Sequence, residues 1–252
     1  MTYSFCEWND PGGVRLNTRV VPFSGGSRTP GAGEGILPTQ FHLFSGFLCL
    51  AGALLIGLTI HLRYPCGPWT LFLGGLGLFF GFFYSNKPIR WVSRGIGEIL
   101  TGFCCSWLPL ATGSYLVMGF FNDRVLLLSI PVGLSIFNVA LMNEFPDEDG
   151  ARAAGKRNLV VRFGKERMSD LYLGLSILAG FSFVKVIMIF GHDPWWLMML
   201  AGAPLLLTVW SVYLVWQKGF RDAKKLQILC RNTVWVNLSM TMILTVQQTL
   251  IV

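Results

Sequence analysis

The chain has 252 residues, of which 53% are hydrophobic and only 13% are charged. Globular domains carry about 25% charged residues, so this composition excludes an ordinary soluble enzyme, a disordered chain and a nucleic-acid-binding tail. The formal net charge is +7. In a chain this apolar, the positions of the cations are more informative than their sum. We therefore expect an all-α fold, a polytopic bundle of transmembrane helices.

A single membrane domain is predicted to span residues 1–252. The first 41 residues are polar and rich in glycine and proline, without the basic segment and apolar core of a signal peptide, and we expect them to form a loop. A transmembrane helix needs ~20 mainly apolar residues. Seven segments within 42–252 have this pattern, which puts the two ends of the chain on opposite sides: 42–62, 69–86, 96–118, 124–143, 169–190, 195–216 and 232–251.

The distribution of cations predicts the orientation of these segments. Seventeen of the 20 lysines and arginines fall in loops on one side, whereas the other side has only Arg63 and Arg124, and Lys185 lies within a segment. Cytoplasmic loops of membrane proteins are enriched in lysine and arginine. We therefore expect residues 1–41 to face the cytoplasm and Val252 to lie outside, in a membrane that we expect to be a prokaryotic cell membrane.

Acidic residues gather in one place, the sequence NEFPDEDG that follows the fourth segment. Asn143 and Asp147 are four residues apart and would share one face of a helix. Such oxygen ligands suit Mg²⁺, which binds through one or two carboxylates together with water and substrate phosphate. Lys156 and Arg157 come shortly afterwards and suit phosphate oxygens. The pattern favours a metal-bridged diphosphate at the membrane boundary.

A purely structural interpretation fits the same spacing. Pro146 is suited to the first turn of a new short helix, where acidic side chains complement the helix dipole. Cations that follow a span also obey the positive-inside rule. Spacing alone leaves both interpretations open.

The stretch NEFPDEDGARAAGKRNLVVRFG closely resembles the second aspartate-rich motif of the UbiA superfamily of intramembrane prenyltransferases. The likeness is greatest to the branch of 1,4-dihydroxy-2-naphthoate polyprenyltransferases. That family's pattern is Asn-Asp/Glu-x-x-Asp-x-x-x-Asp followed by Gly-Lys-Arg-Thr-Leu. VPFSGGSR and RGIGEILTGFCCSWLPLATGSYLV resemble other family segments in the same order. The residues that match the pattern are Asn143, Glu144, Asp147, Gly155, Lys156, Arg157 and Leu159.

The resemblance implies a nine-span fold and an activity in quinone biosynthesis, such as that of menaquinone. In the family, two aspartate-rich motifs hold Mg²⁺ on the diphosphate of a polyprenyl donor. Ionisation of the donor leaves an allylic carbocation, and an aromatic quinone precursor resembling dihydroxynaphthoate attacks it. The protein neutralises the departing diphosphate and encloses the tail in a dry apolar tunnel, which the spans rich in glycine and phenylalanine suit.

The sequence departs from the family at its beginning. Seven of the nine spans are present, so the first span and most of the second are expected to be missing. The first motif falls at residues 6–17, where one register places Cys6, Asp10 and Val14 at the positions of Asn, Asp and Asp. A second register opens on Asn9 and Asp10. In both registers Asp10 is the carboxylate left at a ligand position.

The second motif also departs, because Ala151 replaces its last aspartate and Asp149 is a candidate substitute. Fewer carboxylates attract Mg²⁺ less strongly. These departures motivate an alternative function, a catalytically lapsed homologue that acts as a lipid- or quinone-binding membrane subunit.

The resemblance implies three ligands: a polyprenyl diphosphate donor, an aromatic acceptor and Mg²⁺. It also implies that membrane lipid surrounds the protein and that no nucleic acid is bound. Arg28 and Arg90 are either diphosphate contacts or simply topogenic cations. Glu98 lies just inside the third segment, where an acid is costly unless it faces a cavity or a partner. We expect Asp10 and Asp147 to be catalytic. The expected metal ligands are Asp10, Asn143, Asp147 and Asp149, and the expected substrate contacts are Lys156, Arg157, Arg28, Arg90 and Glu98.

Overall fold

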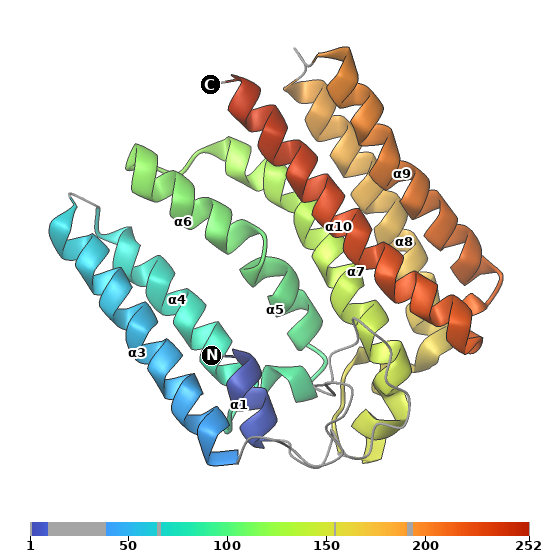
Figure 1. Ribbon diagram of the computed structural model, residues 1–252, viewed down its shortest axis with the longest axis horizontal. Coiled ribbons are helices and arrows are strands. Elements are labelled where there is room, and N and C mark those ends of the chain that lie inside the picture. The colour runs from blue at the N-terminus through green and yellow to red at the C-terminus, as the bar shows by residue number, and fades with distance from the viewer. Residues whose placement is uncertain (1, 10–38, 65–66, 154, 191–193, 252) are drawn as a thin grey trace.

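The computed structural model describes residues 2–9, 39–64, 67–153, 155–190 and 194–251, which form helices and turns with no strand among them (Figure 1). The all-α expectation is confirmed for this part of the chain. The helices are α1 (Thr2–Asn9), α3 (Thr39–Arg63), α4 (Trp69–Phe83), α5 (Gly97–Cys104), α6 (Trp107–Met118), α7 (Asp123–Ala153), α8 (Leu159–Ile189), α9 (Trp195–Trp216) and α10 (Ala223–Ile251), with short 3₁₀ turns η1 (Trp91–Ser93) and η2 (Gly219–Arg221).

Five helical segments in the described residues are long and apolar enough to cross a membrane: α3, α5 with α6, α7, α8 and α9. The chain is therefore an integral, multi-pass membrane protein. The seven segments expected from the sequence are all helical, but two of them fall outside this group. Helix α4 is apolar but has only 15 residues, and α10 has 29 residues with asparagine, threonine and glutamine along its length.

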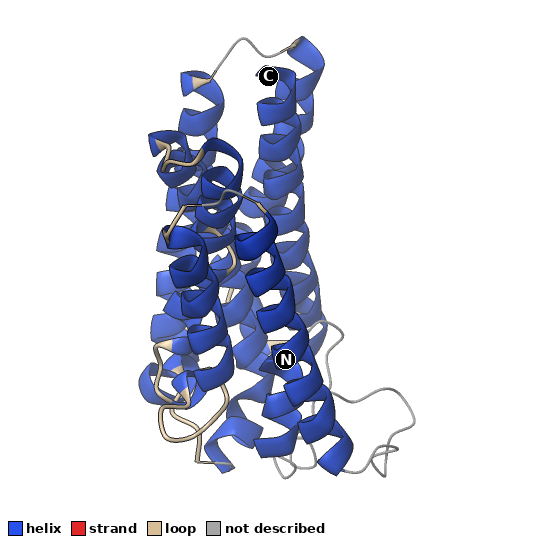
Figure 2. Ribbon diagram, turned by 90° about the vertical axis from the view of Figure 1, so that its left-hand side faces the viewer, coloured by secondary structure: helices blue, strands red, loops and turns tan. Residues whose placement is uncertain are grey.

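A four-helix unit of α7, α8, α9 and α10 forms the larger part of the bundle (Figure 1). Two buried apolar clusters lie within it, one around Phe145 and Leu229 and the other around Phe183 and Met240. Helices α5 and α6 pack on α7, and α4 packs on α6 with α3 outermost. Seen from the side, the helices run along a common direction (Figure 2). The end of α10 lies at the opposite end of the bundle from the turn between α7 and α8.

The first eight described residues correct one expectation. Residues 1–41 were expected to form a loop, but Thr2–Asn9 is the helix α1. Phe5 is only 1% exposed, and its ring makes edge contacts with the rings of Phe47 in α3 and Phe82 in α4. Asn9 donates from Nδ2 to Oδ1 of Asn86 at 2.6 Å. Burial against distant helices stabilises this short helix, and such contacts are not visible in the local pattern.

Several expected segments also differ in extent or continuity. The segment 96–118 is interrupted at Cys105 and Ser106, where the Ser106 hydroxyl donates to the carbonyl of Gly102 at 2.6 Å. Helix α8 begins ten residues before the expected 169, and it has a non-helical residue at Gly164. Helix α10 begins at Ala223 rather than 232 because Asp222 accepts hydrogen bonds from the amides of the first turn. These bonds, that of Lys225 foremost, hold the pKa of the Asp222 carboxyl below its usual range.

Helices α5 and α7 cross closely at glycines. A Cβ atom on Gly102 would lie 3.1 Å from the backbone oxygen of Gly133, and one on Gly133 would lie 2.8 Å from Oγ of Ser106. Small residues therefore let the two helices approach closely at this crossing. In α4, by contrast, a Cβ on Gly74 or Gly75 would meet no atom within 4 Å. Those glycines line an apolar cavity of about 490 Å³ between α3 and α4.

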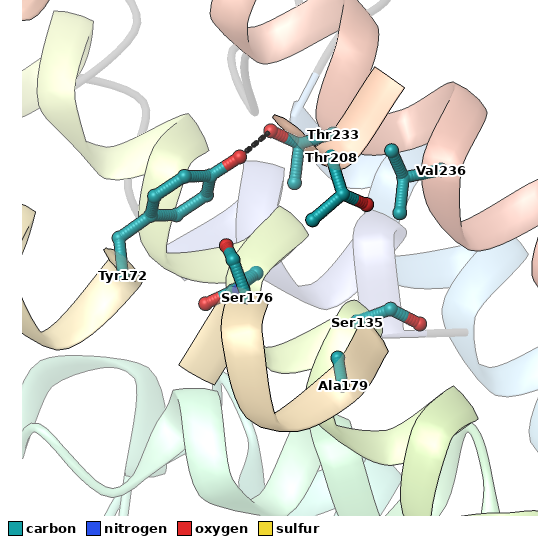
Figure 3. A pocket seen from close by; sticks show the side chains of 8 residues that line it. Ser135, Tyr172, Ser176, Ala179, Thr208, Thr233 and Val236 are labelled. Carbon is teal, nitrogen blue, oxygen red and sulfur yellow. Dashed lines mark hydrogen bonds between the residues drawn. The ribbon is translucent and has the colours of Figure 1, made fainter. Parts of the chain in front are cut away.

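The interior of the four-helix unit also contains polar side chains (Figure 3). Asn138 donates to Ser176 at 3.0 Å, and the hydroxyls of Tyr172 and Thr233 are 2.9 Å apart. These contacts tie α7 to α8 and α8 to α10. They surround a cavity of about 10 Å³, which is room for about one water molecule. This cavity is therefore too small to hold a large substrate.

We predict that Gly102→Val destabilises the protein, because the new side chain meets a backbone oxygen that cannot move without shifting α7. Overpacking of this kind costs about 1–3 kcal/mol. Gly74→Val is the matched control, since it adds the same side chain to an open position. Thermal unfolding in detergent measures both variants. Equal unfolding midpoints for Gly102→Val and the parent would contradict the close crossing.

Candidate functional site

Helix α7 runs without interruption through the acidic cluster to Ala153. The interpretation of Pro146 as the start of a new helix is therefore wrong. Proline lacks an amide hydrogen, so the carbonyl of Met142 loses its usual partner one turn earlier. The thiol of Cys230 in α10 donates to that carbonyl at 3.6 Å. This contact helps to satisfy the backbone where the helix would otherwise be weakened.

Because α7 is continuous, Asn143, Asp147 and Ala151 follow one another at intervals of four and form one stripe on its surface. The predicted sharing of a face by Asn143 and Asp147 is thus met. Asn143 and Asp147 are both half-buried. Ala151, at the position of the family's last aspartate, is buried and contributes only a methyl group to the stripe.

The other acids of the cluster point in different directions, since successive residues of a helix are turned by about 100°. Glu144 accepts from the amide of Val160 at 3.5 Å. Glu148 forms ion pairs with Arg152 at 2.8 Å and Lys165 at 3.1 Å. Asp149 is exposed and lies about 200° around the helix from Asp147. The structure therefore does not bring Asp149 onto the stripe of Asn143 and Asp147.

The described residues do not hold three or more His, Cys, Asp or Glu side chains close enough together to form a metal site of their own. The stripe nevertheless fits a Mg²⁺ ion that is shared with a phosphate. Oδ1 of Asn143 is buried and has no hydrogen-bond partner among the described residues, so it is an oxygen ligand in need of a cation or donor. Asp147 adds a carboxylate one turn later. Mg²⁺ takes its remaining ligands from water and phosphate oxygens.

The turn that follows α7 has a defined geometry. Gly155 has φ of +70°, its amide donates to the carbonyl of Arg152 at 3.1 Å, and the amide of Lys156 donates to that of Ala151 at 2.9 Å. This pair of bonds is the Schellman motif, which needs a left-handed residue and so favours glycine. The glycine of the Gly-Lys-Arg sequence thereby places two cations directly after the end of the stripe.

The next residues begin α8 immediately. Asn158 is the N-cap, and its side chain accepts from the amide of Val161 at 2.9 Å. The amide of Arg157 donates to the carbonyl of Ser93 at 3.2 Å, which joins the turn to η1. The carbonyl of Arg157 in turn accepts from Nε of Arg162 at 2.7 Å. The backbone that carries Lys156 and Arg157 is therefore held from α7, from η1 and from α8.

The remaining predicted residues have different locations. Asp10 and Arg28 lie outside the described residues. Arg90 precedes η1 and has a left-handed conformation with φ of 50°, in the segment that contacts the Lys156–Arg157 turn through Ser93. Glu98 is 2% exposed, and it faces a partner, as a buried acid must: Oε1 accepts from the amide of Leu159 at 3.0 Å. Roles for these four residues in substrate or metal binding stay predictions.

Sequence reasoning missed three contributors to this region. Glu144 was matched to the family pattern without a contact being assigned, and the structure places it against α8. The carbonyl of Ser93 carries no sequence signal, because any residue has one. Asn158 did have a signal, since asparagine ahead of an apolar run is a common N-cap.

We predict that Gly155→Ala destabilises the protein, because an L-residue in the left-handed region costs roughly 1–2 kcal/mol. Gly174→Ala is the control, as Gly174 is helical and a Cβ there would meet nothing within 4 Å. The control variant should be as stable as the parent or slightly more stable. Unfolding midpoints in detergent compare the three proteins, and a Gly155→Ala protein as stable as the parent would contradict the Schellman turn.

Comparison with known proteins gives the family. The sequence profile of the UbiA prenyltransferase family matches residues 28–236. The 2-carboxy-1,4-naphthoquinone phytyltransferase of Synechocystis sp. is 28% identical over 179 residues, which is 70% of this chain and 55% of that protein. The 1,4-dihydroxy-2-naphthoate octaprenyltransferase of Escherichia coli is 29% identical over 163 residues, or 64% of this chain and 52% of that protein.

The octaprenyltransferase of the same name from Bacillus subtilis is 22% identical over 137 residues, or 54% of this chain and 44% of that protein. The chain thus spans about half the length of the curated relatives that it matches. No solved structure matches it significantly. Because the family profile covers most of the sequence, including the stripe on α7 and the turn after it, this chain belongs to the UbiA prenyltransferase family.

Proposed function

We propose that this protein transfers a polyprenyl group from its diphosphate to an aromatic quinone precursor of the dihydroxynaphthoate type, with Mg²⁺ and within the membrane. Family membership supports the class of reaction. The named activities of the relatives, which act on naphthoate or naphthoquinone compounds, support the class of acceptor. Five helical segments are long and apolar enough to cross the membrane, which is where a polyprenyl tail would lie.

One observation carries the proposal: a stripe with two oxygen ligands ends in a turn that carries two cations. Asn143 and Asp147 are on α7, and the backbone of Lys156 is hydrogen-bonded to Ala151, the next residue of the same stripe. Both kinds of group suit a diphosphate, since Mg²⁺ held by the stripe would supply positive charge to its oxygens and cationic side chains would neutralise the rest of its charge. Arg90 is a further candidate contact from the neighbouring loop.

In this proposal the chain's own residues bind and orient the donor and exclude water from the site. Lys156 and Arg157 hold the diphosphate oxygens, while Asn143 and Asp147 would be ligands of the metal. When bound, Mg²⁺ supplies positive charge that stabilises the diphosphate as it leaves. The bond between the first prenyl carbon and the diphosphate oxygen breaks, and that carbon joins a ring carbon of the acceptor, which loses a proton. Asp10 would add a carboxylate from the first motif, and Arg28 a further cation.

The orientation proposed for the protein follows from its cations. The turn between α7 and α8 lies at the end of the bundle that also holds η2 and the start of α10 (Figure 1), and the lysines and arginines of the sequence concentrate in these connections. By the positive-inside rule this end is cytoplasmic. The diphosphate would then be bound from the cytoplasm and the C-terminus would lie outside.

A second candidate function is that of a lapsed homologue that binds a lipid or quinone as a membrane subunit. One observation favours it: the third position of the stripe is the methyl group of Ala151, where the family has a carboxylate. A folded, membrane-inserted protein that binds a naphthoquinone but transfers no prenyl group would support this candidate over the first.

We predict that Asp147→Ala lowers prenyl transfer by more than about 100-fold, because loss of even an outer-sphere partner of a metal ligand costs roughly 10–100-fold. The assay follows a labelled polyprenyl diphosphate and a dihydroxynaphthoate acceptor in vesicles that contain the full chain. Asp123→Ala is the control, since Asp123 is in the first turn of α7 at the other end of the helix. Asp149→Ala should have a much smaller effect than Asp147→Ala. Transfer by Asp147→Ala at the parent's rate would exclude Asp147 as a metal ligand that the reaction needs.

A further inference from the structure

Two glutamates from different helices lie against the first turn of α8. Glu98 of α5 accepts from the amide of Leu159 at 3.0 Å, and Glu144 of α7 accepts from the amide of Val160 at 3.5 Å. Asn158 accepts from the amide of Val161. Three consecutive amides that helix geometry leaves without internal partners are thus each met by a side chain. The three side chains come from three separate elements of the chain.

This arrangement gives Oε1 of the buried Glu98 carboxyl group a hydrogen-bond donor. An acid that is 2% exposed is costly unless something compensates its charge. The N-terminus of a helix carries a partial positive charge and offers amide donors. Glu98 and the start of α8 therefore stabilise each other, Glu98 with the stronger of the two glutamate contacts by distance. The close crossing of α5 and α7 at Gly102 and Gly133 brings α5 near enough for this contact.

The same contact restrains the cationic turn. Leu159 is two residues after Arg157, so fixing its amide fixes the end of the short segment that begins at Gly155. The other end of that segment is held by the Schellman bonds to α7, and its middle by the bond from Arg157 to Ser93. Without Glu98, the segment would lose the hydrogen bond that joins its end to α5.

We propose that Glu98, assisted by Glu144, is a positioning residue for the diphosphate: it docks the start of α8 and so holds Lys156 and Arg157 where a diphosphate can bind. The inference rests on the proposed function for its diphosphate-binding part only. The docking itself is a property of the fold and can be measured without substrate. Glu98 touches the backbone of α8 and acts on the substrate through Lys156 and Arg157.

The test compares three variants of the full chain in detergent or nanodiscs. Glu98→Leu removes the acceptor, whereas Glu98→Gln keeps an oxygen that can accept from Leu159. Asn138→Leu is the control for general loss of stability, because it removes a buried hydrogen bond elsewhere on α7. Hydrogen exchange of the amides of Leu159, Val160 and Val161 reports docking. Tryptic cleavage after Lys156 and Arg157 reports the freedom of the turn.

Binding of inorganic diphosphate in the presence of Mg²⁺ is then measured by titration calorimetry, and transfer kinetics give kcat and KM for the donor. For Glu98→Leu we expect exchange and cleavage to rise, and diphosphate affinity to fall, by about tenfold, the order expected when one hydrogen bond to a charged group is lost. KM for the donor should rise more than kcat falls. Glu98→Gln keeps the hydrogen bond without the charge and should lie closer to the parent than to Glu98→Leu. Asn138→Leu should lower the unfolding midpoint without these changes.

The outcomes separate the docking from the function. Unchanged exchange at Leu159–Val161 in Glu98→Leu would overturn the positioning role, whatever the activity. Faster exchange with unchanged diphosphate affinity would show that the docked turn does not govern diphosphate binding and would overturn the proposal's second half. A parent protein that binds no diphosphate with Mg²⁺ would refute the proposed function, while the exchange data would still decide whether Glu98 docks α8.

Discussion

Four residues between two long helices, Gly155 to Asn158, determine where the cations of the candidate site stand. The carbonyls at the end of α7 and the amides at the start of α8 must all find partners, because unpaired backbone groups are costly in a membrane protein. Schellman bonds give partners to two of these carbonyls, and Asn158, Glu98 and Glu144 give partners to three of these amides. Each partner that satisfies the backbone also restrains the Lys156–Arg157 turn, so the contacts that complete the fold also set the geometry of the candidate site.

Because of helical periodicity, the side chains of the acidic cluster point in different directions and make different contacts. Residues that are neighbours in sequence face α8, the cations of Arg152 and Lys165, the open surface, or the stripe of Asn143 and Asp147. A run of acids that looks like one negatively charged patch in the sequence is therefore divided among structural and candidate functional contacts. Only two oxygen-bearing side chains remain on the stripe, which matches a metal that shares its coordination with substrate phosphates.

The sequence predicted the all-α membrane fold, the positions of seven helical segments and the shared face of Asn143 and Asp147, because hydropathy and helix periodicity are local properties. It did not predict α1, whose stability depends on Phe5 contacting two distant helices. It also ended the fourth span at 143, although a thiol from α10 helps α7 to continue through Pro146. The position of Glu98 at the start of a span predicts that it needs a partner, but the partner, the amide of Leu159 in α8, depends on how distant helices pack and has no local signal.

We propose that the stripe and the turn together bind a prenyl donor's diphosphate with Mg²⁺ and allow transfer of the prenyl group. The most direct measurement is prenyl transfer by the full chain in vesicles, with a labelled polyprenyl diphosphate and a panel of dihydroxynaphthoate and other aromatic acceptors, in Mg²⁺ and in excess chelator. We expect product with a naphthoate acceptor in Mg²⁺ and no product in excess chelator. A folded, membrane-inserted chain that yields neither product nor free diphosphate in Mg²⁺ would contradict it.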